Sequence, residues 1–550
     1  MQGGYGIDAR DADTPDNWVP RHPDLIRLTG RHPFNVEPPL TMLMDAGLIT
    51  PPAIHIVRDH GAVPKLDWET HTIEIGGAVS NPLTITMDEL SKMETISFPC
   101  TVTCAGNRRK EQNMTKQTVG FNWGAAATGC SVWTGVPLRN LLLKAGVKDK
   151  ENGARFVCME GADKLPNGYY GTCLGIDQAM DPTMDVIVAF EQNGQRLIPD
   201  HGYPVRMIIP GWIGGRMVKW MTKITITEKE SDNYYHFFDN RILPPQVRRL
   251  HHLCPHAVLP MYVRSCARHW VGGQAERALV SSHRRMVFDP TDVCLQVDKE
   301  IADKDGWWYK PEYLFNELNI NSAIASPAHG EVVKFLGKKS YTMRGWAYSG
   351  GGKKVTRVEV SFDQGKTWEL CDLEHLPPNH AGKHWCWCHW KFEAPIKYML
   401  AAANSHVRVR AWDQTSNTQP FELTWNVMGM GNNPHFKVNV HPYQTADGDP
   451  ALWFEHPTIA GPGAGGWMVK PAEDFPVGTK TLSFKEPPAG HADWQKALTN
   501  NAAYSPLAMS KADKGADKPA GNTGTCCLPR VLLIGRAGKP MLGSTARASD

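Results

Sequence analysis

Several features are missing from this 550-residue sequence, and each absence excludes a class of protein. No apolar run approaches the ~20 residues that a membrane-spanning helix needs. The N-terminal segment lacks the apolar core of a secretory signal peptide. The formal net charge is only +3, which argues against a protein that binds nucleic acid or a membrane surface. We therefore expect a cytoplasmic protein with neither nucleic acid nor membrane as a partner.

Cysteine usage indicates the redox environment of the chain, and its length indicates the number of domains. The 13 cysteines are odd in number and follow no regular spacing. Such usage fits reduced thiols in the cytoplasm better than a disulfide framework. A chain of this length is too long for one hydrophobic core, so two or three domains are expected, and 19 tryptophans help to fill them.

Hydrophobic patterning divides the chain into four parts. Residues 1–50 are rich in proline and charge and are predicted to form an extended arm. In residues 51–324, short β-type runs (72–75, 205–209, 224–227) mix with helical segments such as 138–145, which indicates an α+β domain. In residues 325–480, β-rich runs (341–348, 355–362, 385–392, 407–412) alternate with glycine turns and predict an antiparallel β-sandwich. Residues 481–550 have the composition of a linker with an atypical tail.

Cys104 is the best clue to chemistry. It leads into Ala-Gly-Asn and then three cations, Arg108, Arg109 and Lys110. The small residues let the backbone approach a ligand closely, and the cations favour a thiolate and attract an anion. A lone thiolate beside an anion site suits a soft metal that keeps open positions for substrate. The competing interpretation is a buried structural cysteine beside a solvated charge run.

Further motifs accompany Cys104 along the chain. They include Thr-Gly-Arg-His-Pro-Phe-Asn (29–35), Val-Arg-Asp-His-Gly-Ala-Val-Pro (57–64), Gly-Phe-Asn-Trp-Gly-Ala-Ala-Ala (120–127), Asp-His-Gly-Tyr-Pro-Val-Arg (200–206), Gly-Trp-Ile-Gly-Gly-Arg-Met-Val-Lys-Trp (211–220) and Phe-Glu-His-Pro-Thr (454–458). Together, over roughly residues 15–470, the sequence resembles the molybdenum module of eukaryotic assimilatory nitrate reductase, in the sulfite oxidase superfamily. The resemblance implies a mixed α/β molybdopterin-binding domain followed by an immunoglobulin-like β-sandwich that carries the contact of a homodimer.

The resemblance also implies a set of site residues. Cys104 would be the protein's only direct ligand to a molybdenum atom whose other sulfur ligands come from molybdopterin. Such a large anionic cofactor needs hydrogen-bond donors along its length and a cation at its phosphate. The positions that correspond to cofactor contacts are Arg58, His60, Asp163, His201, Arg206, Gly215, Arg216, Met217, Val218 and Lys219.

Two positions favour nitrate over sulfite as substrate. Where sulfite oxidases resemble Trp-Asn-Leu-Arg-Gly, this chain has Met428 in place of the arginine. Losing one pocket cation removes roughly 4 kcal/mol of attraction per unit charge at ~4 Å and an effective dielectric of ~20, which matters more for dianionic sulfite than for nitrate. Asn240 stands where sulfite oxidases place a tyrosine, and its amide can donate to a nitrate oxygen. Arg109 would hold the anion, and Trp123 would wall the site.

The complete family enzyme is expected to contain haem and FAD in further domains. This chain shows neither a His-Pro-Gly-Gly haem signature nor a glycine fingerprint for nucleotide binding after a strand. A separate electron-donor domain or protein is therefore expected as a partner, besides nitrate. The resulting prediction is molybdenum-dependent reduction of nitrate to nitrite by oxygen-atom transfer. The alternatives are sulfite oxidation on the same scaffold, or an inactive dimerisation scaffold.

Residues 247–296 interrupt the family pattern. They hold seven arginines and no lysine, five histidines and three cysteines, without clear periodicity. The pattern would be continuous if Gln246 joined Val297. The segment begins with Val247, and every valine codon begins with GT. It ends with Gln296, and one of the two glutamine codons ends with AG. We hypothesise that the segment is a translated, retained intron; a disordered insertion is the alternative. Consistent presence of the segment in the mature transcript would refute the intron.

Overall fold

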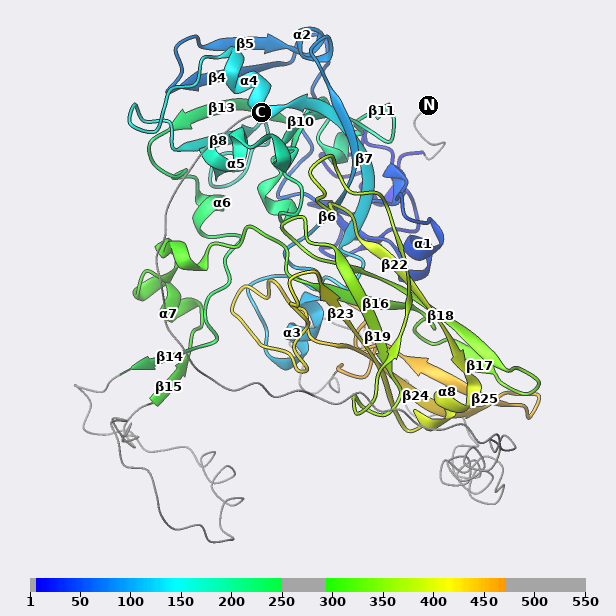
Figure 1. Ribbon diagram of the computed structural model, residues 1–550. Helices are drawn as coiled ribbons and strands as arrows, with labels where there is room; N and C mark the ends of the chain where they lie inside the picture. The colour runs from blue at the N-terminus through cyan, green and yellow to red at the C-terminus, as the bar shows by residue number, and fades with distance from the viewer. Residues whose placement is uncertain (1–5, 250–292, 464, 470–550) are drawn as a thin grey trace, which may run out of the picture. The chain divides into compact units, whose positions relative to one another are not determined.

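The computed structural model describes residues 6–249, 293–463 and 465–469, all within one compact unit, Met1–Trp494 (Figure 1). The α-helices among them are short, and most join strands. They are α1 Leu40–Asp45, α2 Met87–Ser91, α3 Arg109–Thr115, α4 Leu138–Lys144, α5 Ile176–Met180, α6 Tyr234–Phe237, α7 Lys299–Lys304 and α8 Ile396–Ala401. None of the described helices is both long and apolar enough to cross a membrane.

Two five-stranded sheets build the α+β part. One has the order β11-β10-β7-β6, with β12 also paired to β10. The other has the order β5-β4-β13-β8-β9, in which β4 and β13 run parallel. The strand bounds are β4 Thr72–Gly77, β5 Leu83–Thr86, β6 Ile96–Thr103, β7 Thr128–Pro137, β8 Phe156–Gly161, β9 Gly171–Gly175, β10 Ile187–Gln192, β11 Gln195–Arg196, β12 Arg206–Ile208 and β13 Met221–Thr227.

These strands share one apolar core. It contains Trp133 of β7 and Ile224 of β13, and the buried face of α4 contributes Leu138 and Leu141. Burial of aliphatic and aromatic side chains on one face of each element is the main source of stability for such a layer. The strands predicted near residues 72, 205 and 224 and the helix predicted at 138–145 are confirmed.

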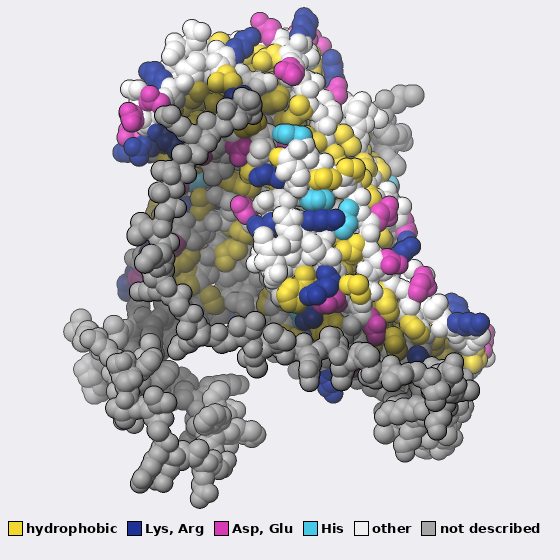
Figure 2. All heavy atoms as spheres, viewed as in Figure 1, with side chains coloured by type: hydrophobic (Ala, Val, Ile, Leu, Met, Phe, Trp, Pro, Cys, Tyr) yellow, Lys and Arg dark blue, Asp and Glu magenta, His cyan; other side chains and the backbone are white. Residues whose placement is uncertain are grey.

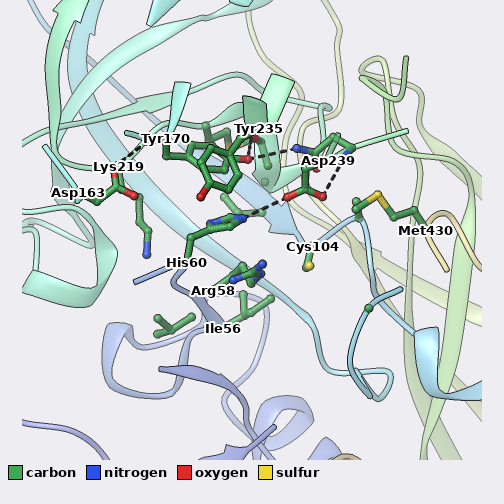
Figure 3. A pocket seen from close by; sticks show the side chains of 18 of the residues that line it. Ile56, Arg58, His60, Cys104, Asp163, Tyr170, Lys219, Tyr235, Asp239 and Met430 are labelled. Atoms are coloured by element: carbon green, nitrogen blue, oxygen red, sulfur yellow. Dashed lines mark hydrogen bonds and ion pairs between the residues drawn. The ribbon is translucent and has the colours of Figure 1, made fainter. Parts of the chain in front are cut away.

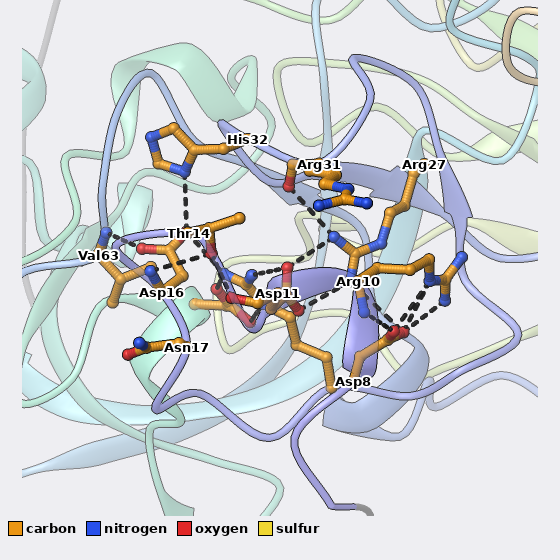
Figure 4. Close-up of polar contacts among 12 residues, drawn as sticks. Asp8, Arg10, Asp11, Thr14, Asp16, Asn17, Arg27, Arg31, His32 and Val63 are labelled. Atoms are coloured by element: carbon orange, nitrogen blue, oxygen red, sulfur yellow. Dashed lines mark hydrogen bonds and ion pairs between the residues drawn. The ribbon is translucent and has the colours of Figure 1, made fainter.

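The first fifty residues differ from the extended arm that their composition predicted. β1 (Ile26–Arg27) and β2 (Asn35–Glu37) form a small sheet with β3 (Val57–Arg58). Buried ion pairs hold this region together. Arg21 pairs with Asp11, Asp16 and Asp200, and its guanidinium carbon lies 3.7 Å from the centre of the Phe34 ring. Figure 4 shows the neighbouring pair of Arg27 with Asp11, at 2.7 Å. Charge there is buried in pairs, so composition alone made the segment look solvated.

The second part is the predicted β-sandwich. A four-stranded sheet, β16-β18-β22-β21, faces a six-stranded sheet, β17-β25-β24-β23-β19-β20. The bounds are β16 Asn321–Ser326, β17 Val332–Lys334, β18 Ser340–Tyr348, β19 Val355–Ser361, β20 Glu369–Leu370, β21 Asp372–His375, β22 Cys388–Pro395, β23 Ser405–Asp413, β24 Phe436–Gln444 and β25 Pro450–Glu455. Three of the four predicted β runs match β18, β19 and β23.

The fourth predicted run, 385–392, begins three residues early. Residues 385–387 precede β22 and lie instead against β6 of the other domain. Thr101 donates its N–H to the Trp385 carbonyl at 3.0 Å, and Trp387 donates its N–H to the Thr101 hydroxyl at 2.8 Å. Cys386 belongs to this contact, with its thiol donating to the Pro99 carbonyl at 3.0 Å, and Cys388 is a buried residue at the start of β22.

The two ends of the segment that interrupts the family pattern lie side by side. β14 (Gln246–Arg249) and β15 (Val293–Gln296) are antiparallel, and Gln246 is the direct partner of Gln296. Val297 donates its N–H to the Pro245 carbonyl at 3.2 Å. The two points that the hypothetical splice would join are therefore neighbours, while the interior of the segment and residues 470–550 lie outside the described residues.

Charged side chains are mixed in sign on the surface. Figure 2 shows Lys and Arg side chains interspersed with Asp and Glu side chains over the face that it draws, in keeping with the small net charge.

Candidate functional site

A cavity of about 310 Å³ opens where the two domains meet. Its walls come mostly from the α+β part, and Met428 and Met430 of the sandwich part complete them (Figure 3). Cys104 lies on this wall together with Arg58, His60 and Arg109. The sequence segments around residues 56, 104, 201, 215, 240 and 428, which are distant along the chain, thus meet in one place.

Cys104 follows directly after β6 and precedes α3, so a rigid strand sets its position. Its N–H donates to the Ala127 carbonyl at 2.9 Å, and Gly106 donates its N–H to the thiol sulfur at 3.4 Å. Burial raises the pKa of the Cys104 thiol, and the charge of Arg109 opposes this only in part. The cation thus favours the thiolate, as expected, but burial outweighs it in the protein alone; a bound metal cation would reverse the balance.

The three cations after Cys104 do not act together. Arg108 points away from the cavity and forms an ion pair with Glu111 at 2.7 Å. Lys110 donates to the carbonyls of Ile459, Gly461 and Gly463 at 2.7–2.8 Å. Only Arg109 lines the cavity, so one cation of the run is available to an anion there.

Arg109 is held by backbone rather than by carboxylates. Its Nε donates to the carbonyls of Met428 and Gly429 at 3.0 and 3.1 Å. A Cβ built on Gly106 or Gly120 would lie 2.6 or 2.4 Å from the guanidinium carbon, so both glycines are needed to make room for this side chain. The carbonyls fix the guanidinium without neutralising it, so its charge remains available for an anion in the cavity.

Asn240 lines the cavity from the loop after α6. Its backbone has φ of 56°, in the left-handed region that asparagine tolerates better than most residues. Its amide Nδ2 donates to the Tyr170 hydroxyl at 3.2 Å, and that hydroxyl donates to the Gly215 carbonyl at 2.7 Å. A Cβ on Gly215 would lie 2.2 Å from Asn240 Oδ1, so only glycine fits there. One N–H of the amide is left for a substrate oxygen.

The other end of the cavity is rich in buried donors and acceptors. His55 Nδ1 donates to the Ile56 carbonyl at 3.2 Å, and its Nε2, like Arg206 Nε, has no partner among the described residues. Burial lowers the pKa of His55 to about 4, so the ring is neutral and Nε2 is an acceptor. Burial also lowers the pKa of Arg206, to about 10, but the guanidinium stays charged. Unpartnered buried polar atoms are costly, which indicates that they bind a polar ligand.

Lys219 and His201 extend this end. Lys219 Nζ forms an ion pair with Asp59 and donates to the Asp200 carbonyl at 2.9 Å, and His201 Nε2 donates to the Pro52 carbonyl at 2.9 Å. A cation at one end, donors along the wall and one sulfur at the other end fit an elongated anionic cofactor that brings its own metal ligands. Among the described residues no cluster of three or more His, Cys, Asp or Glu side chains could hold a metal ion by itself.

Between the two ends, His60 contacts Asp239, with Nε2 and Oδ2 3.1 Å apart (Figure 3). Burial lowers the pKa of His60 to about 4, and the charge of Arg58 adds to the effect. Burial alone would raise the pKa of Asp239, but the hydrogen bond from His60 and the charge of Arg58 lower it overall. The pair is thus a neutral imidazole that donates to a carboxylate.

Most of the predicted site residues line this cavity. They are Arg58, His60, Cys104, Arg109, Asp163, His201, Arg206, Gly215, Met217, Lys219, Asn240 and Met428. Three do not. Trp123 is fully buried and packs on Phe121, which itself lines the cavity. Val218 is part of the apolar core, and Arg216 lies behind the wall, where it donates to the Asn240 carbonyl at 3.2 Å.

Several wall residues were missed by sequence reasoning. Asp239 stands beside Asn240 and could have been found from that position, since a carboxylate next to a pocket amide is a candidate for ordering a histidine. His55, Phe121 and Tyr170 carried no such signal, because the walls that they form are assembled only by the tertiary fold.

Two family models match the chain, each in the part whose geometry it explains. Residues 60–235 match an oxidoreductase molybdopterin binding domain, and residues 312–443 match a Mo-co oxidoreductase dimerisation domain. The chain belongs to the molybdopterin-binding oxidoreductases. This family membership accounts for both halves of the described structure, since the cavity lies mainly in the first domain and the β-sandwich is the second.

Among the relatives of this molybdopterin-binding oxidoreductase are nitrate reductases about half identical to it in sequence. It is 50% identical over 485 residues to a NADH nitrate reductase of Volvox carteri, covering 87% of this chain and 50% of the relative. It is 49% identical over 471 residues to NADH nitrate reductase 1 of Nicotiana tabacum, covering 84% and 46%. The chain thus spans about half the length of the curated relatives that it matches.

A solved structure shows the same fold at low sequence identity. The sulfane dehydrogenase SoxCD from Paracoccus pantotrophus has a TM-score of 0.52 and 22% identity, over 79% of this chain and 88% of that chain. The fold class, a mixed α/β molybdopterin-binding domain followed by a β-sandwich, is confirmed.

Proposed function

We propose that this chain reduces nitrate to nitrite at a molybdenum–molybdopterin site centred on Cys104. The carrying observation is the pairing of that single sulfur with Arg109, a charged guanidinium held only by carbonyls on the same cavity wall. The identity to NADH nitrate reductases over both domains supports the choice of reaction.

The residues of the chain would divide the work. Cys104 would hold the metal, and the unpartnered atoms of His55 and Arg206, with Lys219, would hold the pterin and its phosphate. Arg109 would bind the nitrate oxygens by charge-assisted hydrogen bonds, and Asn240 would donate a further one. When bound, the molybdenum cofactor supplies two electrons and accepts the oxygen atom that nitrate loses. Phe121, backed by Trp123, would exclude water from one side.

Nitrate is favoured over sulfite by what faces the anion. Met428 lines the cavity with a neutral side chain, and its carbonyl is committed to Arg109. Asn240 brings an amide rather than a phenol. Arg109 is the one cation that the run after Cys104 brings to the cavity, and Met428 adds none, which matches a planar monoanion better than a dianion.

Homodimer formation through the sandwich and electron supply by a separate domain or protein belong to this proposal. The dimerisation model over residues 312–443 supports the first, and the shared half of the NADH-dependent relatives supports the second. The cysteines whose side chains the structure describes are free thiols, which supports a reducing, cytoplasmic compartment. The domain boundaries at 51–324 and 325–480 are part of the same proposal.

The test compares two substrates on one preparation. The chain, loaded with molybdenum cofactor, is assayed for nitrite production from nitrate with a reduced viologen, and for sulfite-dependent reduction of an artificial electron acceptor. The proposal expects bound molybdenum and nitrite production, with sulfite turnover much lower. Faster turnover of sulfite would overturn the substrate assignment, and absence of molybdenum would leave the inactive scaffold as the better description.

A further inference from the structure

Two cysteines outside the cavity face each other across neighbouring strands. Cys158 of β8 and Cys173 of β9 are direct partners in the antiparallel register. On either side, Ile176 donates its N–H to the Arg155 carbonyl and Gly161 donates its N–H to the Tyr170 carbonyl. Since hydrogen-bonded pairs alternate along an antiparallel ladder, Cys158 and Cys173 form a non-hydrogen-bonded pair, in which Cα atoms lie only about 4.5 Å apart.

That spacing lies within the range that a disulfide requires. Cα atoms of disulfide-bonded cysteines are usually about 4.4–6.8 Å apart, so a bond here needs little backbone movement. Both residues are free thiols, with Cys158 half-buried and Cys173 buried. A reagent in solution can therefore reach Cys158 first.

The surroundings give the two thiols different roles. The hydrogen bond with Cys173 is the largest cause of a lowered pKa at Cys158, and the same bond raises the pKa of Cys173. Cys173 Sγ accepts from the Ser231 N–H at 3.3 Å, and His236 Nε2 lies 3.7 Å from it. A half-buried thiol of lowered pKa beside a buried thiol is the arrangement of an attacking and a resolving cysteine.

Cys173 is also connected to the cavity. Arg216 Nη1 lies 3.1 Å from His236 Nδ1, and because a guanidinium only donates, the proton of the neutral ring is on Nε2, toward Cys173 and Glu230. Arg216 Nη2 in turn donates to the Asn240 carbonyl at 3.2 Å. The helix α6, which bears His236 and leads to Asn240, packs against β9. A change at Cys173 therefore acts on the contacts that hold the Asn240 loop.

We propose that Cys158 and Cys173 form a reversible disulfide by exchange with a small-molecule disulfide, and that this bond loosens the loop from Ser231 to Asn240. Cys158 thiolate attacks the small disulfide and releases one thiolate. Cys173 loses its proton to that thiolate and attacks the Cys158 sulfur, which releases the second half of the small disulfide as a thiolate, and this takes up from water the proton that Cys158 gave up on becoming a thiolate. Two electrons pass from the dithiol to the small disulfide. Cys173 thereby loses the proton it shares with Cys158, and its sulfur moves away from Ser231 and His236.

The test treats the full 550-residue chain with oxidised glutathione and then alkylates it in denaturant with isotopically distinct reagents before and after reduction. Mass spectrometry of the peptides should show Cys158 and Cys173 joined in wild type. Cys173→Ser should stop at one glutathione on Cys158, and Cys158→Ser should leave Cys173 as a thiol. Cys371→Ser, which removes a buried thiol of the sandwich, is the matched control and should not change the result.

Hydrogen exchange measures the second half of the proposal. Backbone amides of residues 231–240 should exchange faster in the oxidised wild type than in the reduced one, and at equal rates in Cys158→Ser with and without oxidised glutathione. Free Cys158 and Cys173 after treatment, or an unmodified Cys158 in Cys173→Ser, would overturn the exchange site. A disulfide with unchanged amide exchange would overturn its connection to the Asn240 loop.

Discussion

The cavity and the interior of the β-sandwich bury side chains of opposite character. The sandwich encloses Trp346, Trp390 and Val360, which lie on its strands and are at most 1% exposed. The cavity wall instead gathers arginines, a lysine, carboxylates and one thiol, and it leaves His55 Nε2 and Arg206 Nε without a partner among the described residues. The interior of the sandwich is mainly apolar and stabilises the fold, whereas the cavity gathers charged and polar groups around a hollow, at a cost in stability, for a ligand. Variants should therefore separate into those that affect activity and those that affect folding.

The largest effect is expected from Cys104→Ala. Removing the one thiol among the described residues of the cavity wall should reduce viologen-driven nitrite production to background, because the metal loses its only ligand from the chain. The sandwich lies outside the contacts of this side chain, so its thermal unfolding should not change. Nitrite production at the wild-type rate would show that another group holds the metal.

Arg109→Gln should come next. It keeps a planar donor but removes the cation, and loss of a donor to a reacting oxyanion costs about 100-fold or more in kcat/KM. Steady-state kinetics against nitrate measures the loss. Arg108→Gln is the neighbouring comparison: Arg108 pairs with Glu111 away from the cavity, so its loss should lower stability more than nitrate turnover. An equal fall in kcat/KM for Arg109→Gln and Arg108→Gln would contradict the assignment of Arg109 as the cation that binds nitrate.

Leu452→Ala should show the reverse behaviour. Leu452 on β25 is 1% exposed, and truncating a buried leucine costs about 2–5 kcal/mol of unfolding free energy. Denaturant unfolding measures that loss, and kcat/KM of the folded fraction should stay within about twofold of wild type. A large fall in kcat/KM under conditions in which the variant is fully folded would show that the sandwich interior also determines activity.

Glu37→Gln is expected to act through pH. Burial raises the pKa of Glu37 from 4.5 to about 8, so the folded protein keeps a proton that the unfolded chain releases. Stability from this group is present below pH 4.5 and is lost as pH rises toward 8, at no more than about 1.4 kcal/mol per pH unit. The glutamine amide of the variant cannot titrate, so unfolding measured across this window should depend less steeply on pH. An unchanged slope would show that Glu37 is ionised throughout.

The smallest effect is expected from deleting residues 247–296. Val297 donates its N–H to the carbonyl of Pro245, the residue before Gln246, at 3.2 Å, so a tight turn can join Gln246 to Val297. The unfolding free energy should change by less than about 1 kcal/mol, and nitrite production should be kept or increased. A deleted chain that fails to fold would mean that the segment is a required part of the domain, and would count against the retained intron.

Local patterns predicted most of the fold. Period-two alternation gave β18, β19 and β23, and the helical pattern gave α4, because each signal depends on neighbours in sequence. The N-terminal fifty residues were misread, since the ion pairs of Arg21 reach as far as Asp200. Residues 385–387 were assigned to the following strand, because their contact with Thr101 depends on docking between domains.

The site residues were predicted by matching the sequence motifs of this chain to those of a known family, rather than from the chemistry of neighbouring residues. That match correctly predicted Arg58, Lys219 and Asn240 as residues of the cavity wall, but a motif match does not show which side chains point into the cavity. Arg216 and Val218 therefore came along with Gly215 and Met217, although they face the core. The state of the Cys104 thiol could not be read from its neighbours either, because Arg108 and Lys110 turn away and burial outweighs the one cation that remains.

The most direct test of the central claim is X-ray absorption at the molybdenum edge of the cofactor-loaded chain, with Cys104→Ser beside wild type. If Cys104 is the ligand, the variant should show one sulfur neighbour fewer around molybdenum while retaining pterin. An identical sulfur shell in the two proteins, with the metal still bound, would contradict the account.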